Sequence, residues 1–286
     1  MSVPLYATFQ EPLRSGFRIA YQTTGGGYHP LHWHDELEIL YHLNGLSDIT
    51  IDGKTYPLRN KHMVVIDSRQ VHGSYNHQRN AMFLRIHISK SYMEKFVPGL
   101  SLYSIRCTPD DVNDATFQDY VQICLLLQDL VRAYSRDDVT LPMETEGYIL
   151  QIFSRIIRCF GYPQREVPTG VDVLTAERIR TVITYVEEHF REPISLQEVS
   201  DLLGLGKEAF CRFFKKNMGR TFLQYVNEVR AVNAFQDLEY TDLPISEIME
   251  RNGFTTQKLF NRTFKEIYGC TPSAARKEAA EYKGEK

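Results

Sequence analysis

The apolar and polar positions in the last third of the chain follow one plan twice. In Ile194–Gly219, a short run with apolar residues at helical spacing leads to a glycine and then to a longer run, and Ile245–Gly269 repeats this order. Corresponding positions are offset by 49 residues in the first run and by 50 in the second. The offset changes between the two runs, where a turn accepts a difference in length most easily. The pattern therefore predicts two copies of one helical motif.

Each copy is predicted to be a helix-turn-helix. Ser195 and Glu198 have the spacing of a capping box at the start of a first helix. Phe210 and Phe214 lie four residues apart and define a buried stripe on the second helix. A glycine then ends that helix. We expect helix-turn-helix motifs at about 195–219 and 244–269, within an all-α domain that spans 176–286.

The second helix of each copy is predicted to expose polar and positively charged side chains. Such a face suits the major groove of DNA, where Arg and Lys bind phosphates or guanine and Gln and Asn pair with adenine. The chain has a net charge of −3, but Lys207–Arg220 contains five Lys or Arg residues and one Glu, a local net charge of +4. A charged helix face is usually only solvated, whereas two copies with the same distribution favour double-stranded DNA as a partner. The predicted DNA-binding residues are Lys207, Glu208, Cys211, Arg212, Lys215, Lys216, Thr255, Thr256, Gln257, Lys258, Asn261, Arg262 and Lys265.

The first third of the chain alternates apolar and polar positions as β-strands do. Several short apolar runs between residues 32 and 88 are separated by Asn44-Gly45, Asp52-Gly53 and similar turn sequences. Short strands at this regular spacing are typical of a small antiparallel barrel or jelly roll. We therefore expect a β-barrel within residues 1–110.

Residues 111–162 change to helical spacing. Apolar residues from Phe117 to Tyr134, and again from Tyr148 to Ile157, recur every three or four positions. Two interpretations remain open, because the helices could cover the barrel or present their apolar surface to a second copy of the chain, and the surface is broad enough for both. The prolines and glycines of residues 163–175 predict a linker.

Composition limits the class of protein. The chain of 286 residues is long enough for two domains with separate cores. It has no apolar run near the roughly 20 residues of a membrane-spanning helix. Five scattered cysteines and the lack of a signal-peptide pattern indicate a cytoplasmic protein without a membrane partner. No nucleophile–base pair, phosphate-binding loop or dinucleotide motif is present, so we expect no enzyme activity.

Three short motifs in the last third of the chain are specific. They are Arg212-Phe213-Phe214-Lys215-Lys216, Gly253-Phe254-Thr255-Thr256 and Gly269-Cys270-Thr271-Pro272. Through these motifs, residues 176–282 resemble the DNA-binding domain of the AraC-type transcription regulators. Asn252 departs from the family pattern, in which cysteine is frequent at this position. The resemblance implies an α+β protein in which a cupin-like antiparallel β-barrel and a helical dimerisation segment precede an all-α domain with two helix-turn-helix motifs. It also implies a homodimer, with RNA polymerase as a further candidate partner.

Histidines are concentrated in the predicted barrel, with eight of the nine between residues 29 and 87. His32, His34 and Glu38 have the spacing of the first cupin motif, and His72 suits the second, so this stretch resembles a cupin and, more closely, the sensing domain of the AraC-type family. These four residues would offer a divalent metal three imidazoles and a carboxylate. The alternative is a pocket that requires no cofactor and binds a small-molecule effector. The predicted effector-binding residues are His32, Trp33, His34, Glu38, Tyr41, His72, Tyr75, Arg85 and His87.

Three functions are compatible with this organisation. The tandem helical motifs favour a sequence-specific DNA-binding transcription regulator that responds to a small molecule in the barrel, with a carbohydrate suggested by family analogy alone. The second hypothesis is a metal-dependent cupin enzyme with a DNA-binding appendage. The third is a constitutive regulator whose barrel only dimerises. The effector, the operator and the sign of regulation do not follow from the sequence.

Overall fold

The computed structural model describes residues 16–23, 27–78, 81–136, 138–163 and 173–277. Most of the predicted linker at 163–175 therefore lies outside the described residues. The chain divides into two compact units. Unit 1 contains strand β1 together with residues 33–70 and 76–163, and unit 2 contains residues 27–32, 71–75 and 173–277. Residues 27–32 and 71–75, which the sequence predicted to be part of the barrel, therefore belong to the same unit as the C-terminal helices.

The first sheet has the strand order β1-β8-β3-β6, and its paired neighbours are antiparallel. These four segments are rich in β-branched and aromatic residues, which favour strands. The two antiparallel sheets of the N-terminal region confirm the predicted strand architecture. The strands of the first sheet are β1 (Phe17–Thr23), β3 (Leu37–Asn44), β6 (Met63–Ile66) and β8 (Met82–Ile88).

The second sheet contains the remaining long strands in the order β2-β7-β4-β5. Within unit 1, β4 and β5 form the hairpin that the sequence predicted. Both residues of its turn have positive φ, 46° at Asp52 and 81° at Gly53, as a two-residue hairpin of this type requires. The strands are β2 (Gly27–His32), β4 (Ser47–Ile51), β5 (Lys54–Leu58) and β7 (His72–Asn76).

Strand β3 separates two apolar cores of unit 1. Its first six residues are all buried, so neither of its faces meets solvent. Leu37, Ile39 and Tyr41 point into the larger core, which includes residues of two long helices. Leu40 points the other way and packs in a second core with Phe83 of β8. One face of the strand therefore packs against the helices, and the other face packs in the interior of the barrel.

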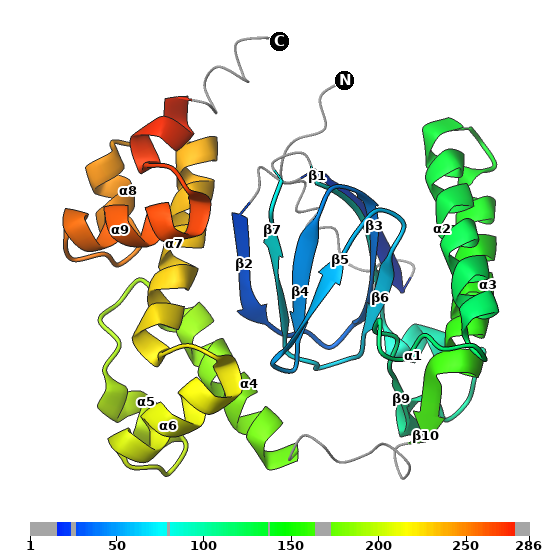
Figure 1. The fold of residues 1–286 in the computed structure, drawn as a ribbon, viewed down its shortest axis with the longest axis horizontal. Helices are drawn as coiled ribbons and strands as arrows, with labels where there is room; N and C mark the ends of the chain where they lie inside the picture. Colours follow the sequence, from blue (N-terminus) through cyan, green and yellow to red (C-terminus); the bar gives the residue numbers. More distant parts are fainter. Residues whose placement is uncertain (1–15, 24–26, 79–80, 137, 164–172, 278–286) are drawn as a thin grey trace. The chain divides into compact units, whose positions relative to one another are not determined.

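The two long helices of unit 1 are α2 (Phe117–Arg136) and α3 (Leu141–Phe160), which pack against each other and cover one face of the first sheet (Figure 1). This confirms that the pair covers the sheet. Asp119 of α2 also forms ion pairs with Arg155 and Arg158 of α3, at 2.8 and 2.7 Å. Phe117 and Leu125 remain half exposed, and their use in a dimer stays a prediction. The smaller elements are α1 (Lys90–Met93), a 3₁₀ turn η1 (Leu100–Leu102), β9 (Tyr103–Ile105) and β10 (Gly161–Pro163).

Unit 2 contains the predicted helical domain. Phenylalanines at helical spacing fill its two small cores, which explains why the apolar pattern repeats in the sequence. Phe210 and Phe214 pack edge-on against Phe222 with ring centroids 5.3 and 5.6 Å apart, and Phe260 and Phe264 occupy the corresponding positions in the other core. The helices are α4 (Val173–His189), α5 (Leu196–Leu202), α6 (Lys207–Met218), α7 (Phe222–Tyr240), α8 (Ile245–Arg251) and α9 (Gln257–Tyr268). Among the described residues, no helix is both long enough and apolar enough to cross a membrane.

Candidate nucleic-acid interface and effector site

The first helix-turn-helix consists of α5 and α6. The predicted capping box is present, because Ser195 Oγ accepts from the Glu198 amide at 3.1 Å and Glu198 Oε2 accepts from the Ser195 amide at 3.1 Å. Gly204 adopts φ +62° in the turn, a conformation that favours glycine. Gly206 caps α6 without a side-chain hydrogen bond. Local sequence signals therefore define this motif correctly.

Helix α6 buries its phenylalanine stripe and exposes its charged face. Phe210, Phe214 and Met218 are buried. Gly219 ends the helix with φ +70°. All six of the predicted contact residues on this helix are exposed, namely Lys207, Glu208, Cys211, Arg212, Lys215 and Lys216. The helix thus presents the cationic face that the sequence predicted.

The second helix-turn-helix consists of α8 and α9, and its polar face is exposed in the same way. Thr256 has an additional role, because its hydroxyl caps α9 by accepting from the Leu259 amide at 3.3 Å. Arg262 lies 3.9 Å from Glu266 one turn later, an exposed pair that contributes little to stability. The exposed members of the predicted set are Thr255, Thr256, Gln257, Lys258, Asn261, Arg262 and Lys265.

Helix α7 joins the two motifs, and Arg230 connects it to the segment that follows α4. The Arg230 guanidinium donates from Nε to the carbonyl of Phe190 at 2.6 Å and from Nη2 to the carbonyl of Glu192 at 2.7 Å. Hydrogen bonds from a charged donor are stronger than those between neutral groups. The backbone of Gly253, in the turn of the second motif, packs against the carbonyls of Phe190 and Arg191. Sequence reasoning missed this arrangement, because main-chain acceptors have no residue signature.

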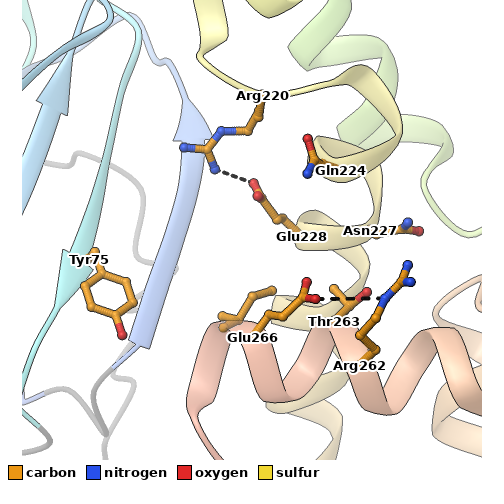
Figure 2. Close-up of a pocket in the computed structure, with 9 residues that line it drawn as sticks. Tyr75, Arg220, Gln224, Asn227, Glu228, Arg262, Thr263 and Glu266 are labelled. Atoms are coloured by element: carbon orange, nitrogen blue, oxygen red, sulfur yellow. Dashed lines mark hydrogen bonds and ion pairs between the residues drawn. The ribbon is translucent and has the colours of Figure 1, made fainter.

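A polar pocket of about 490 Å³ lies between α7 and α9 in unit 2 (Figure 2). Arg220, which lies in the turn before α7, and Glu228 of α7 form an ion pair at its edge. Arg262 of the predicted DNA-binding set also lines the pocket, and so does Tyr75, which the sequence assigned to the effector site. Tyr75 therefore belongs to unit 2, whereas the charged group described next belongs to unit 1.

A compact charged group in unit 1 surrounds Glu38, whose side chain is 2% exposed. Glu38 of β3 lies directly opposite His87 of β8 in the antiparallel register, and Arg85 precedes His87 on the same strand face. His34 lies just before β3. Three nitrogen atoms approach the Glu38 carboxylate: Arg85 Nε lies 2.9 Å from Oε1, and His34 Nε2 and His87 Nε2 lie 3.0 and 3.3 Å from Oε2.

The surroundings of this group influence its protonation. Burial lowers the pKa of His87, and the hydrogen bond with Glu38 partly opposes that shift. His34 Nδ1 lies 3.0 Å from the carbonyl of Glu36. The donor atoms are two imidazole nitrogens and one carboxylate oxygen, and His34, Glu38 and His87 are close enough for one metal ion to bind all three. The donor chemistry therefore fits a divalent transition metal.

The other residues predicted for the barrel site do not all belong to unit 1. His32 and His72 belong to unit 2, where their ring centroids lie 4.2 Å apart, whereas His34 and Glu38 belong to unit 1. Trp33 contacts the guanidinium of Arg69, with the carbon of that group 5.6 Å from the ring.

Tyr41 requires a correction, because it lies on the opposite face of β3 from Glu38 and is packed in the helix-facing core. Its burial there raises its pKa to about 12. Odd and even positions of a strand face opposite sides, and Tyr41 is odd where Glu38 is even. Tyr41 therefore does not line the interior of the barrel with the charged group.

Two family models match separate parts of the chain. An AraC-like ligand binding domain matches residues 15–153, and a helix-turn-helix domain matches residues 199–278. The first match contains the charged group around Glu38, and the second contains α6 and α9. The chain belongs to the AraC-type family of transcription regulators.

Proteins of similar sequence are named as HTH-type transcriptional regulators. An uncharacterized HTH-type transcriptional regulator of Staphylococcus aureus (strain MRSA252) is 28% identical over 173 residues, which are 60% of this chain and 23% of that protein. The chain thus spans about a quarter of the length of this relative. The uncharacterized HTH-type transcriptional regulator YdeC of Bacillus subtilis (strain 168) is 21% identical over 264 residues, 88% of this chain and 87% of that protein.

Several solved structures are also similar. A protein of unknown function from Listeria innocua is 32% identical, with a TM-score of 0.33, over 35% of this chain and 94% of that chain. The DNA-binding domain of AdpA, a global transcriptional factor solved in complex with a target DNA, is 24% identical, with a TM-score of 0.34, over 38% and 96%. The K231A variant of ToxT from Vibrio cholerae is 13% identical, with a TM-score of 0.49, over 92% and 97%.

Proposed function

We propose that the protein is a sequence-specific DNA-binding transcription regulator whose N-terminal region responds to a small molecule. The observation that carries the proposal is the pair of exposed polar helices, α6 and α9, on either side of one connecting helix. Each buries its phenylalanines and presents its Lys, Arg, Gln and Asn side chains to solvent. These are the side chains that bind phosphates and base edges in a major groove.

The two helices are proposed to contribute differently. Helix α6 presents Lys207, Arg212, Lys215 and Lys216, whereas α9 presents Lys258, Arg262 and Lys265 together with uncharged amides. Positive charge adds affinity that does not depend on sequence and that weakens with salt. Binding should therefore depend on salt more strongly through α6 than through α9.

The effector is proposed to bind in unit 1 near Glu38. This part of the barrel interior combines a carboxylate, a guanidinium and two imidazoles, so it suits a polar or hydroxylated ligand such as a carbohydrate. A ligand regulates DNA binding only if it binds more tightly to one state of the protein than to another. A metal-dependent enzyme and a constitutive regulator remain the competing functions.

A gel-shift titration at fixed salt tests the proposal, with the intergenic DNA beside the gene and with sugars and other metabolites as candidate effectors. Selective binding that one compound shifts supports a ligand-responsive regulator. Selective binding that no compound changes supports the constitutive regulator. Equal affinity for the intergenic DNA and for random DNA of the same length would reject the regulator proposal.

A further inference from the structure

We propose that His34, Glu38 and His87 together bind one divalent transition-metal ion. This set differs from the four residues predicted from the sequence, because it includes His87 and excludes His32 and His72. The proposed ion lies where we place the effector, and so it refines the proposed function. Its test is metal binding rather than DNA binding, so either proposal can fail while the other stands.

The distances within the group match the edges of a metal coordination shell. Glu38 Oε2 lies 3.0 Å from His34 Nε2 and 3.3 Å from His87 Nε2. Nitrogen and carboxylate oxygen bind such ions at about 2.0–2.2 Å, so two ligands separated by a tetrahedral or octahedral angle lie about 2.8–3.6 Å apart. Two of the three separations thus have the spacing that one shared ion needs, and the three residues offer ligand atoms that all lie within 4.8 Å of one another.

The orientation of the His34 ring supports the same conclusion. Its Nδ1 lies 3.0 Å from the carbonyl oxygen of Glu36, and a carbonyl can only accept, so Nδ1 is the donor of this hydrogen bond. The other ring nitrogen, Nε2, is thereby turned toward Glu38 Oε2, 3.0 Å away. Metal-binding histidines commonly donate their other ring N–H to a backbone carbonyl in this way.

The fold holds the ligands rigidly. Glu38 and His87 are directly opposite each other on paired strands, so their separation is fixed by the register. Arg85 Nε lies 2.9 Å from Glu38 Oε1. This ion pair is made by the carboxylate oxygen that does not face the two imidazoles. Two imidazoles and one carboxylate leave further coordination positions open, where an effector with oxygen donors could bind.

The experiment uses the full-length protein purified without a polyhistidine tag. After treatment with a chelator, it is titrated with Zn²⁺ by calorimetry and with Co²⁺ by visible absorption. We expect one ion per chain. His87→Ala and Glu38→Gln should each weaken binding at least 100-fold, which exceeds the roughly 10–100-fold loss typical of an outer-shell partner. The control is His77→Ala, whose exposed ring lies 2.9 Å from Asp48, and it should bind as the wild type does.

Two results would overturn the proposal. The first is wild-type protein that binds neither Zn²⁺ nor Co²⁺ at 1:1 stoichiometry. The second is binding that His32→Ala and His72→Ala abolish while His87→Ala retains it, which would assign the ion to the set predicted from the sequence. If His87→Ala fails to fold by circular dichroism, proton NMR of the Co²⁺-loaded wild type decides. The proposed site predicts strongly shifted ring N–H signals from two histidines, whereas the set predicted from the sequence would give three.

Discussion

Asn252 donates from its side-chain amide to the carboxylate of Asp237 at 2.8 Å and to the carbonyl of Ile248 at 2.9 Å. Asn252 is 1% exposed and lies between α8 and the turn of the second helix-turn-helix, while Asp237 lies near the end of α7. The bond therefore connects the linking helix to the second motif. It also explains why this chain can have an asparagine where its family frequently has a cysteine.

Removing this amide should destabilise unit 2. Asn252→Ala removes a buried amide together with its hydrogen bonds to the Asp237 carboxylate and the Ile248 carbonyl, and losing a hydrogen bond to a charged group costs about 1.5–3 kcal/mol. Urea unfolding monitored by circular dichroism measures the change. The exposed Asn261→Ala on α9 is the matched control and should alter stability by less than about 0.5 kcal/mol. Equal effects of the two substitutions would contradict the structural role of Asn252.

The corresponding glycines of the two motifs should differ in their tolerance of alanine. At Gly204, φ is +62° and no atom of the described residues would lie within 4 Å of an alanine Cβ. Alanine there should cost about 1–2 kcal/mol from the backbone alone. At Gly253, φ is +78° and a Cβ would lie 2.6 Å from the Phe190 carbonyl oxygen. That clash should add about 1–3 kcal/mol. Thermal unfolding of the two variants side by side tests this order, and a larger loss for Gly204→Ala would refute it.

Arg230 is expected to fix how the two recognition helices are presented. Arg230→Met retains the length of the side chain but removes both bonds to the carbonyls of Phe190 and Glu192. We expect lower stability and a larger loss of affinity for DNA with both half-sites than for DNA with one half-site scrambled. Equilibrium binding to the two DNAs measures this difference. Arg132→Met, an exposed control on α2 whose ion pair with Asp129 lies within that helix, should leave the ratio of the two affinities unchanged.

Arg212 and Lys215 of α6 should contribute to DNA binding in different ways. If Arg212 contacts a base, Arg212→Ala should lower affinity for the preferred sequence by about 1–3 kcal/mol and relax the preference at one position. If Lys215 contacts a phosphate, Lys215→Ala should weaken binding to all sequences and reduce the salt slope by about 1. Competition titrations at several salt concentrations separate the two effects. Unchanged affinity for the preferred sequence would exclude Arg212 from base recognition.

Stability should fall as the pH drops through the range in which His42 becomes protonated. His42 is fully buried, with Nε2 3.0 Å from Ser47 Oγ, and burial lowers its pKa to about 4. The unfolded state, with a pKa near 6.5, binds the proton first, so this contribution is complete above about pH 6.5 and is lost as the pH falls to 4. The loss should reach about 3 kcal/mol. Urea unfolding between pH 7.5 and 4.5 measures it, and His42→Gln should show a flatter profile.

The sequence predicted the helical domain well because its signals are local. The capping box of Ser195 and Glu198, the phenylalanine spacing and the terminal glycines all act within one or two helical turns. The exposed faces of α6 and α9 follow from the same spacing, and all of their predicted residues are exposed. Contacts between distant segments, such as Arg230 with Phe190, have no comparable signal because the acceptor is the main chain.

The barrel site was only partly predictable for a related reason. His34 and Glu38 are close in the sequence, so their association follows from spacing. The pairing of Glu38 with His87 depends on the register of β3 and β8, which a single sequence does not specify. The prediction that Tyr41 lines the site is wrong, because an odd-numbered residue of β3 faces the helices while Glu38 faces the barrel interior.

The burial of both faces of β3 also bears on how this protein can evolve. Leu37 and Ile39 are committed to the packing of α2 and α3, while Glu38 and Leu40 are committed to the barrel interior. A change that adapts the interior to a new ligand therefore alters the strand that supports the helices. New ligand preferences should arise more readily from residues outside β3, and this strand should vary slowly as the family diverges.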